Sequence, residues 1–280
     1  MREITLMWCR YLDFAKAFDK VPHKRLLNKV RGFGIGGELL RWIENWLTDR
    51  FQRVRCEGAW SGWRRVLSGI PQGPVLGPIL FLMFIDDLDE GLTSRILKFA
   101  DDSKIFRVVN GPEDRNALQE DLRRLSDWSE TWQMKFNVDK CKVMHLRPRN
   151  MYWNYSMGGR HLKEVTEEKD LGVIITNDLK VAAQCSAACV KANRMLGLIK
   201  RTLVNKRRAI LTTLYKSLVR PHLEYSTAAW SPHYAKDREM LERVQRRFTR
   251  MVLGLGDLEY GERLGILGLL TLEERRNVQI

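Results

Sequence analysis

The sequence predicts a mixed α+β unit followed by a unit built from helices. Strand-like apolar runs alternate with helical stretches through the first part of the chain, and from about Val181 the hydrophobic period is helical. No internal repeat or low-complexity linker separates the two parts. We therefore expect domains at 1–150 and 151–280, with a gradual boundary somewhere within 150–182.

In the first part, a short apolar strand should end at Asp13. The run over 75–88 is apolar nearly all round, so this helix should be buried. The other elements expected are helices at 24–31, 38–49 and 112–132, a hairpin of strands 52–56 and 64–67, a second hairpin around Asp101, and strands at 142–146 and 171–175.

The second part should contain three long helices and a shorter one near the end of the chain. Their expected ranges are 182–203, 206–226, 236–253 and 271–279. Pro221 lies inside the second range and should interrupt or kink that helix, because proline cannot donate a backbone hydrogen bond.

Composition indicates a globular protein with an anionic partner. Of the 280 residues 44% are hydrophobic and 29% charged, and the formal net charge is +14, with an excess of basic residues in both halves. Such a charge favours a polyanion, nucleic acid above all. A merely basic soluble protein remains the alternative, and the sequence is silent on protein partners and oligomeric state.

The cysteines and the apolar runs bear on the expected compartment. The five cysteines are scattered without a Cys-x-x-Cys pair, a pattern typical of reduced intracellular thiols. Cys185 and Cys189, four residues apart on a helix, should be packing residues. The stretch 75–85 is too short to span a bilayer, and no signal peptide is visible. We expect no membrane contact and a location in the nucleus or cytoplasm.

Two acidic segments carry the main indication of chemistry. Phe99-Ala100-Asp101-Asp102 lies between two strand-like runs, so the two carboxylates belong to a hairpin turn. Adjacent carboxylates repel each other unless a cation neutralises them, and Mg²⁺ prefers oxygen ligands of this kind. Asp13 lies in a similar apolar setting far upstream. A solvated turn is the alternative for the Asp-Asp pair alone.

Three ordered blocks resemble the reverse transcriptases of non-LTR (LINE-type) retrotransposons. They are Asp13-Phe14-Ala15-Lys16-Ala17-Phe18-Asp19, the loop Gly69-Ile70-Pro71-Gln72-Gly73 and the turn Phe99-Ala100-Asp101-Asp102. Further similar blocks lie at 171–173, 218–225 and 241–247, so the resemblance covers nearly the whole chain. It implies a polymerase palm, an antiparallel sheet with packed helices, followed by an α-helical thumb.

The resemblance also implies an activity and a set of ligands. The activity is RNA-directed DNA polymerisation, in which two Mg²⁺ ions (or Mn²⁺) assist transfer of a dNTP onto a DNA primer along an RNA template. By motif, Asp13 and Asp101 correspond to the metal ligands, and Asp102 to a further essential carboxylate. Lys140 corresponds to a lysine near the departing pyrophosphate, where it acts as a general acid or a charge clamp. An exposed surface lysine is the alternative.

Substrate contacts are implied at two further places. Phe18 corresponds to a bulky residue beneath the incoming sugar, where a ring excludes a 2′-hydroxyl; a core phenylalanine is an equally open alternative. The loop residues that resemble contacts to template and incoming base are Gly69, Pro71, Gln72 and Gly73.

Other charged residues receive different interpretations. Asp19 should cap the turn or helix that follows it, and the acidic run at 86–90 should form a solvated loop after the buried helix. A basic face on the helix at 236–253 should track a phosphate backbone, although a solvated face is the alternative. Its members are Arg243, Arg246, Arg247 and Arg250.

The start of the chain departs from the family pattern. Only twelve residues precede Asp13, where the family places a fingers region whose basic residues hold the triphosphate. We therefore expect weak or undetectable polymerase activity from this chain alone. The competing interpretation is a truncated, inactive retrotransposon remnant that only binds nucleic acid.

Overall fold

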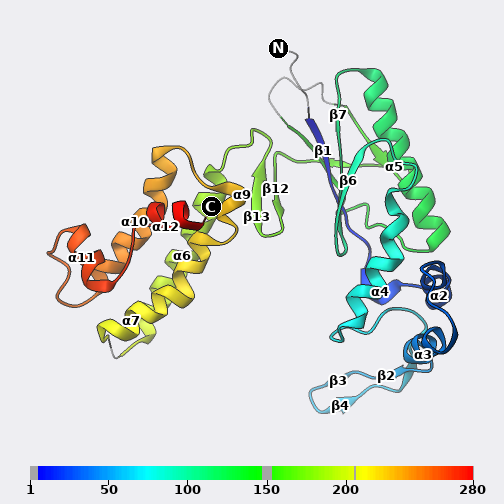
Figure 1. The fold of residues 1–280 in the computed structure, drawn as a ribbon, viewed down its shortest axis with the longest axis horizontal. Helices are drawn as coiled ribbons and strands as arrows, with labels where there is room; N and C mark the ends of the chain where they lie inside the picture. The colour runs from blue at the N-terminus through cyan, green and yellow to red at the C-terminus, as the bar shows by residue number, and fades with distance from the viewer. Residues whose placement is uncertain (1–5, 147–152, 205, 280) are drawn as a thin grey trace. The chain divides into compact units, whose positions relative to one another are not determined.

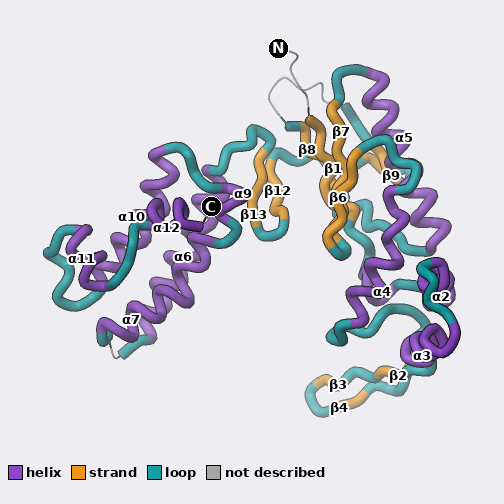
Figure 2. Tube along the Cα trace, viewed as in Figure 1, coloured by secondary structure: helices purple, strands orange, loops and turns teal. Residues whose placement is uncertain are grey.

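The structure, a computed structural model, describes residues 6–146, 153–204 and 206–279. The chain divides into two compact units, Met1–Val165 and Thr166–Ile280 (Figure 1). Each unit has a hydrophobic core of its own. The first unit holds a multistranded sheet, whereas the second consists mainly of helices (Figure 2).

A five-stranded sheet organises the first unit, in the order β11-β8-β1-β7-β6. Its strands are β1 (Leu6–Leu12), β6 (Arg95–Phe99), β7 (Asp102–Val108), β8 (Lys142–His145) and β11 (Lys163–Glu164). The strands pair antiparallel, as expected, except that β11 pairs with β8 in parallel. The central strand is β1, so both of its edges are hydrogen-bonded to neighbours.

Helices cover this sheet and connect its strands. They are α1 (Ala17–Lys20), α2 (His23–Gly32), α3 (Gly37–Leu47), α4 (Leu76–Ile85), the 3-10 helix η1 (Asp86–Asp89) and α5 (Pro112–Trp132). Helix α5 spans the range predicted for it, and it packs on the core through Leu118, Leu122 and Leu125, which are fully buried. A small hairpin of β9 (Ser156–Met157) and β10 (Arg160–His161) completes the unit.

A long hairpin follows α3 and carries exposed residues along its whole length. We call residues 51–65 the hairpin arm. Its strands are β2 (Phe51–Gln52), β3 (Arg55–Cys56), β4 (Ala59–Trp60) and β5 (Arg64–Arg65). β2 pairs with β5 and β3 with β4, so the predicted hairpin is confirmed.

The second unit begins with a β-hairpin and continues as helices. Its elements are β12 (Glu167–Asp170), β13 (Val173–Thr176), α6 (Ala182–Thr202), α7 (Arg208–Leu214), the π-helix η2 (Tyr215–Val219), α8 (Arg220–Glu224), α9 (Thr227–Trp230), α10 (Ala235–Met251), α11 (Tyr260–Leu267) and α12 (Leu272–Gln279). The predicted interruption at Pro221 is confirmed. A π-helical turn ends directly before α8, whose first turn holds the proline.

Two motif blocks of the second unit contact each other. The hydroxyl of Tyr225 donates to the backbone oxygen of Leu171 at 2.9 Å. A Cβ on Gly172 would lie 2.8 Å from the Tyr225 ring, and Gly172 has a φ of +90°. Only glycine allows the hairpin to approach the tyrosine this closely.

The core of the second unit combines packed rings with buried polar groups. The ring of Tyr215 stacks on Phe248 with centroids 4.1 Å apart, and its hydroxyl donates to Gln245 Oε1 at 2.7 Å. The packing role predicted for Cys185 and Cys189 is confirmed, because both are buried. Burial raises the pKa of Cys185 to about 12 and that of Cys189 to about 11. Both thiols therefore stay protonated near neutral pH.

Two predictions about helix α4 and the residues after it are wrong. The helix is not buried all round, since Ile79 is 49% and Leu82 50% exposed. Only one side of α4 packs on the core, and apolar periodicity cannot show which neighbours a helix has.

No helix in the described ranges is long and apolar enough to cross a membrane.

The acidic run after α4 is not a solvated loop. It forms η1, in which Asp87 pairs with the buried ammonium of Lys29 and accepts a hydrogen bond from Trp128 Nε1 at 2.8 Å. Asp89 Oδ1 lies 2.6 Å from Lys98 Nζ. Burial lowers the pKa of Lys29, and the hydrogen bond with Asp87 opposes that effect. These acidic residues connect α2, α4, α5 and β6.

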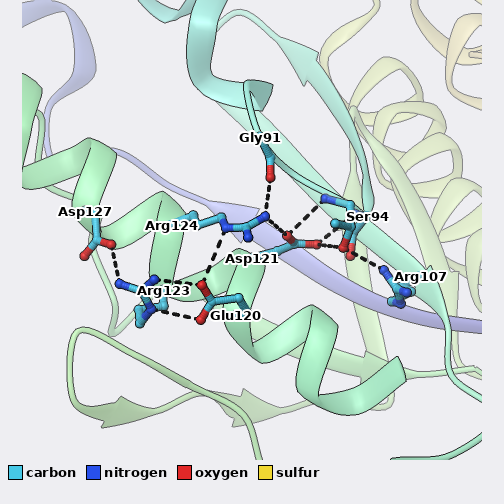
Figure 3. A network of polar contacts seen from close by, with 9 residues as sticks. Gly91, Ser94, Arg107, Glu120, Asp121, Arg123, Arg124 and Asp127 are labelled. Atoms are coloured by element: carbon cyan, nitrogen blue, oxygen red, sulfur yellow. Dashed lines mark hydrogen bonds and ion pairs between the residues drawn. The ribbon is translucent and has the colours of Figure 1, made fainter. Parts of the chain in front are cut away.

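A buried carboxylate fixes the start of β6 against α5 (Figure 3). Asp121 is fully buried and accepts hydrogen bonds from Ser94 N at 2.8 Å, Thr93 N at 3.1 Å and Thr93 Oγ1 at 3.0 Å. Arg124 Nη1 lies 3.6 Å from the same carboxylate. Burial by itself raises the pKa of Asp121, but the hydrogen bonds from Ser94 and Thr93 outweigh it, and the pKa is lowered.

Asp121→Ala should lower the free energy of unfolding by about 3 kcal/mol, because buried donors lose their acceptor. The stabilisation by this carboxylate should be complete above its unfolded pKa of about 3.9 and lost as the pH falls through the lower folded pKa. Urea unfolding of wild type and variant between pH 7 and pH 3 measures both effects. Glu38→Ala, which removes an exposed partner of Arg41 on α3, is the control and should change little. Equal losses in the two variants would contradict this account.

Candidate active site

The pairing of two strands brings the motif carboxylates to one end of the sheet. β1 runs antiparallel to β7, and the last pair of this ladder joins Leu12 to Ser103. Asp13 directly follows Leu12, and Asp102 directly precedes Ser103. Paired residues of antiparallel strands have Cα atoms about 5 Å apart. The backbones of Asp13 and Asp102 are therefore neighbours, although the two residues are 89 positions apart in the sequence.

A tight turn places the third motif carboxylate, Asp101, directly before Asp102. Asp102 pairs with Phe99 across the β6–β7 hairpin, which leaves Ala100 and Asp101 as the turn. Ala100 has a φ of +50°, in the left-handed region. Asp101 and Asp102 are both partly exposed. The predicted strand–turn–strand arrangement is confirmed, with Asp102 as the first residue of β7.

The segment around Asp13 is fixed by the loop before β8. Asn137 N donates to the backbone oxygen of Asp13 at 2.6 Å, and Ala15 N donates to that of Lys135 at 2.9 Å. Phe14 is buried, and its ring stacks on Phe136 with centroids 4.6 Å apart. The backbone of Asp13 is thus held on both sides.

The same loop brings Lys140 to Asp13. Its Nζ lies 2.8 Å from Asp13 Oδ2, while the lysine side chain is 68% exposed. The hydrogen bond to Asp13 raises the pKa of Lys140, so the ammonium stays protonated at neutral pH. Lys140 therefore pairs with Asp13 and neutralises its charge.

The donor set suits a hard divalent cation in its chemistry. Carboxylate oxygens are the ligands Mg²⁺ prefers, and Asp13, Asp101 and Asp102 supply them from adjacent strand ends. Within the described part of the chain, no three His, Cys, Asp or Glu side chains gather into a formed metal site. Asp13 is instead paired with Lys140. A cation bound there would compete with Lys140 for the charge of this carboxylate.

The loop before α4 is hydrogen-bonded to the segment after Asp13. Ile70 N donates to Phe18 O at 2.7 Å, and Gly69 N to Val21 O at 2.9 Å. His23 Nε2 lies 2.8 Å from Gly69 O. These three hydrogen bonds hold the Gly69–Gly73 loop against the segment that follows Asp13.

Gly69 is required where the loop crosses α1. Its φ is +94°, and a Cβ would lie 2.7 Å from the backbone oxygen of Asp19. Gly73 also has a positive φ, +106°, but a Cβ there would meet open space. Pro71 is partly buried, and its backbone oxygen lies against Gly77 of α4. Gln72 and Gly73 are exposed.

Two residues of the first motif differ in their surroundings. Phe18 stacks on Phe81 with ring centroids 4.6 Å apart and packs against the core while remaining partly exposed. The capping role predicted for Asp19 is wrong. Asp19 lies inside α1, and its Oδ1 is 3.4 Å from Gln72 Nε2; α2 begins after Pro22 without a side-chain cap. The physical reason is that the Asp19 side chain contacts Gln72 of the loop that crosses α1, and not the first turn of α2.

A basic pocket of about 910 Å³ lies along this loop. Residues 66–72 line it together with Gln52, one acidic residue, Asp19, and four cationic ones. The cationic residues are Lys16, Lys20, Arg50 and Arg65. The three motif carboxylates are not among its lining residues. These four cations are not among the predicted site residues. The signal in the sequence was that Lys16 and Lys20 lie within or directly after the first block, and Arg50 and Arg65 at the two ends of the hairpin.

The predicted basic face lies on α10 in the second unit. Arg243, Arg247 and Arg250 are exposed. Arg246 is half-buried: its Nη1 is 2.9 Å from Glu239 Oε1, and its guanidinium lies 5.0 Å from the Tyr260 ring centroid. Arg246 therefore contributes to packing, whereas the other three face solvent.

A family model described as reverse transcriptase (RNA-dependent DNA polymerase) matches residues 2–187. The chain belongs to this family. The resemblance drawn from the three motif blocks is thus confirmed. Asp13, the Gly69–Gly73 loop and Asp101-Asp102 all lie within the matched range of this reverse transcriptase chain.

Two of the curated relatives come from mobile elements of Drosophila melanogaster. The chain is 27% identical over 260 residues to the RNA-directed DNA polymerase from mobile element jockey of Drosophila melanogaster, covering 85% of this chain and 28% of that protein. It is 30% identical over 148 residues to the Pol polyprotein of the type-2 element R2DM of the same organism, covering 49% of this chain and 13% of that protein. The chain thus spans under a third of the length of these relatives.

A solved structure of telomerase from Candida tropicalis, in complex with a fragment of telomeric RNA, is also similar. The match covers 96% of this chain and 50% of that one, with 12% sequence identity and a TM-score of 0.43.

Gly69→Ala should destabilise the first unit of this reverse transcriptase chain. The positive φ costs about 1–2 kcal/mol for a residue with a Cβ, and the contact with Asp19 O adds to that cost. Gly73→Ala is the matched control, because it carries the φ cost alone. Chemical denaturation should show the larger loss for Gly69→Ala, and equal losses would contradict the proposed close approach.

Proposed function

We propose that this chain is part of an RNA-directed DNA polymerase that transfers dNTPs onto a primer 3′-hydroxyl along an RNA template. The supporting observation is the β1–β7 register, which puts Asp13 beside Asp102 within a chain of the reverse transcriptase family. In this proposal the first unit is the palm and the second the thumb. The boundary between palm and thumb in this proposal lies between Val165 and Thr166, inside the 150–182 range expected from the sequence.

The metal ligands in this proposal are Asp13, Asp101 and Asp102. Two Mg²⁺ ions, or Mn²⁺, would supply charge neutralisation at the attacking and leaving oxygens of phosphoryl transfer. The chain's own part is to hold carboxylates at adjacent strand ends, fixed by the ladder and by the Asn137 contact to Asp13. Lys140 balances the charge of Asp13 while no cation is bound there.

Lys140 has a second task once it is released from Asp13. In this proposal it then meets the departing pyrophosphate, as a general acid or a charge clamp. Its exposure gives the side chain freedom to turn from the carboxylate to a phosphate.

The substrate contacts proposed are those of Phe18 and the loop. Phe18 is held from below by Phe81 and is partly exposed, so its ring can limit the space beneath an incoming sugar. Gln72 and Gly73 are exposed beside the basic pocket, where they can meet template and incoming base. Gly69 and Pro71 set the path of the loop.

A second function, nucleic-acid binding without catalysis, is favoured by two observations. The described residues hold no assembled group of three metal-ligating side chains, and Asp13 is paired with a lysine. Basic surfaces alone support binding to phosphates. Metal binding and synthesis therefore separate the two candidates.

Mn²⁺ titration and primer extension on an RNA template test the catalytic proposal. Mn²⁺ should bind, as followed by electron paramagnetic resonance, and Asp101→Asn should weaken that binding at least about tenfold, since one charged ligand is lost. Any dNTP-dependent synthesis should disappear in the same variant. Glu38→Gln, an exposed carboxylate of α3, is the control. Equal Mn²⁺ affinity in wild type and Asp101→Asn would refute the metal site. Binding of nucleic acid without synthesis would support the second function.

The exposed arginines of α10 should bind phosphates without reading sequence. Arg243→Ala, Arg247→Ala and Arg250→Ala combined should weaken binding of an RNA–DNA hybrid and reduce the slope of log K against log salt by about 0.7–0.9 per lost contact. Arg246→Ala should act on stability instead, because its guanidinium packs on Tyr260. Fluorescence anisotropy at several KCl concentrations measures the slope. An unchanged slope in the triple variant would remove this face from the proposal.

A further inference from the structure

The hairpin arm, residues 51–65, carries aromatic side chains that neither core uses. Trp60 is 51% and Trp63 62% exposed, and Phe51 and Val54 are exposed as well. All residues of its four short strands are exposed. Large apolar rings at solvent-exposed positions indicate a contact surface.

The two indole rings are held by arginine. The guanidinium carbon of Arg53 lies 3.9 Å from the Trp60 centroid and 4.6 Å from the Trp63 centroid. Arg55, the cross-strand partner of Trp60, lies 5.4 Å from the same ring. Cation–π contacts of this kind favour fixed ring positions. The arm therefore presents two flat rings in a cationic setting.

The charge of the arm identifies the chemistry of its partner. Residues 51–65 contain four arginines and one acidic residue, Glu57. An apolar peptide would match the rings but not this charge. Single-stranded nucleic acid matches both, because its bases stack on aromatic rings and its phosphates pair with arginine.

The arm also continues from the basic pocket. Gln52 and Arg65, at its base, line the 910 Å³ pocket together with the 68–72 loop. Val66 N donates to Arg50 O at 2.8 Å and closes the hairpin there. A strand that occupies the pocket would therefore meet the arm on leaving it.

We propose that the hairpin arm binds single-stranded RNA, with bases stacked on Trp60 and Trp63 and phosphates contacting Arg55 and Arg64. The choice of RNA rests on the proposed function, whereas the stacking chemistry does not. In a duplex, each base face is covered by its neighbours, so the rings should contribute only to single-strand binding.

The test uses the full chain and a labelled oligouridine of about 20 nucleotides, an unstructured probe. Fluorescence anisotropy is recorded without dNTP or divalent cations. Trp60→Ala/Trp63→Ala should weaken binding at least about tenfold, given the usual worth of a stacked base. Trp60→Phe/Trp63→Phe should stay within about threefold, because a ring remains to stack.

Salt dependence separates stacking from charge. The tryptophan-to-alanine pair should leave the slope of log K against log salt unchanged, since no charge is lost. Arg55→Ala/Arg64→Ala should lower the slope by about 1.4, at about 0.7 per phosphate contact of a single strand. Trp42→Ala, an exposed indole on α3, is the matched control and should bind as wild type.

Several results would overturn the proposal. They are wild-type affinity in the alanine pair, equal losses in the alanine and phenylalanine pairs, a matched loss in Trp42→Ala, or equal weakening of a 20-base-pair duplex. Failure of primer extension with oligouridine binding intact would refute only the catalytic proposal. Synthesis with no effect of the arm variants on oligouridine binding would refute only the arm.

Discussion

The antiparallel pairing of β1 with β7 is the constraint on which the first unit depends. This ladder, with its last pair at Leu12 and Ser103, makes neighbours of two motif carboxylates that are distant in the chain. The loop at 135–137 fixes the backbone of Asp13, and Asp121 fixes the strand that leads to Asp101. The supports lie on both sides of the strand ends, so the carboxylates are positioned by the sheet rather than by their own turn.

A second set of contacts connects the carboxylate segment to the substrate loop. The backbone of residues 18–21 accepts the loop's amide hydrogens, and Gly69 allows the two chains to cross. A shift of the loop would therefore move α1, and with it the residues after Asp13. The basic pocket and the hairpin arm begin at the same loop. In the proposed function, one surface carries template, incoming nucleotide and single strand.

Much of the secondary structure was predictable because its signals are local. Helix α5 spans Pro112–Trp132, the range that its periodicity predicted. Ala100 and Asp101 form the turn between the two predicted strands. The exposed side of α4 was not predictable, because an all-apolar helix does not reveal which neighbours it has. Likewise Asp87 was predicted to be solvated and Asp19 to cap a helix, whereas their partners Lys29 and Gln72 come from distant segments.

The amino-acid sequence by itself determined the family, since three motif blocks in this order are specific to it. It also determined the residue types of the candidate site. Tertiary structure alone decided which of those residues meet. It placed Lys140 on Asp13, separated Arg246 from its exposed neighbours, and made Gly69 indispensable. The physical reason is that charge pairing, burial and close approach depend on distances between segments, and strand register sets those distances.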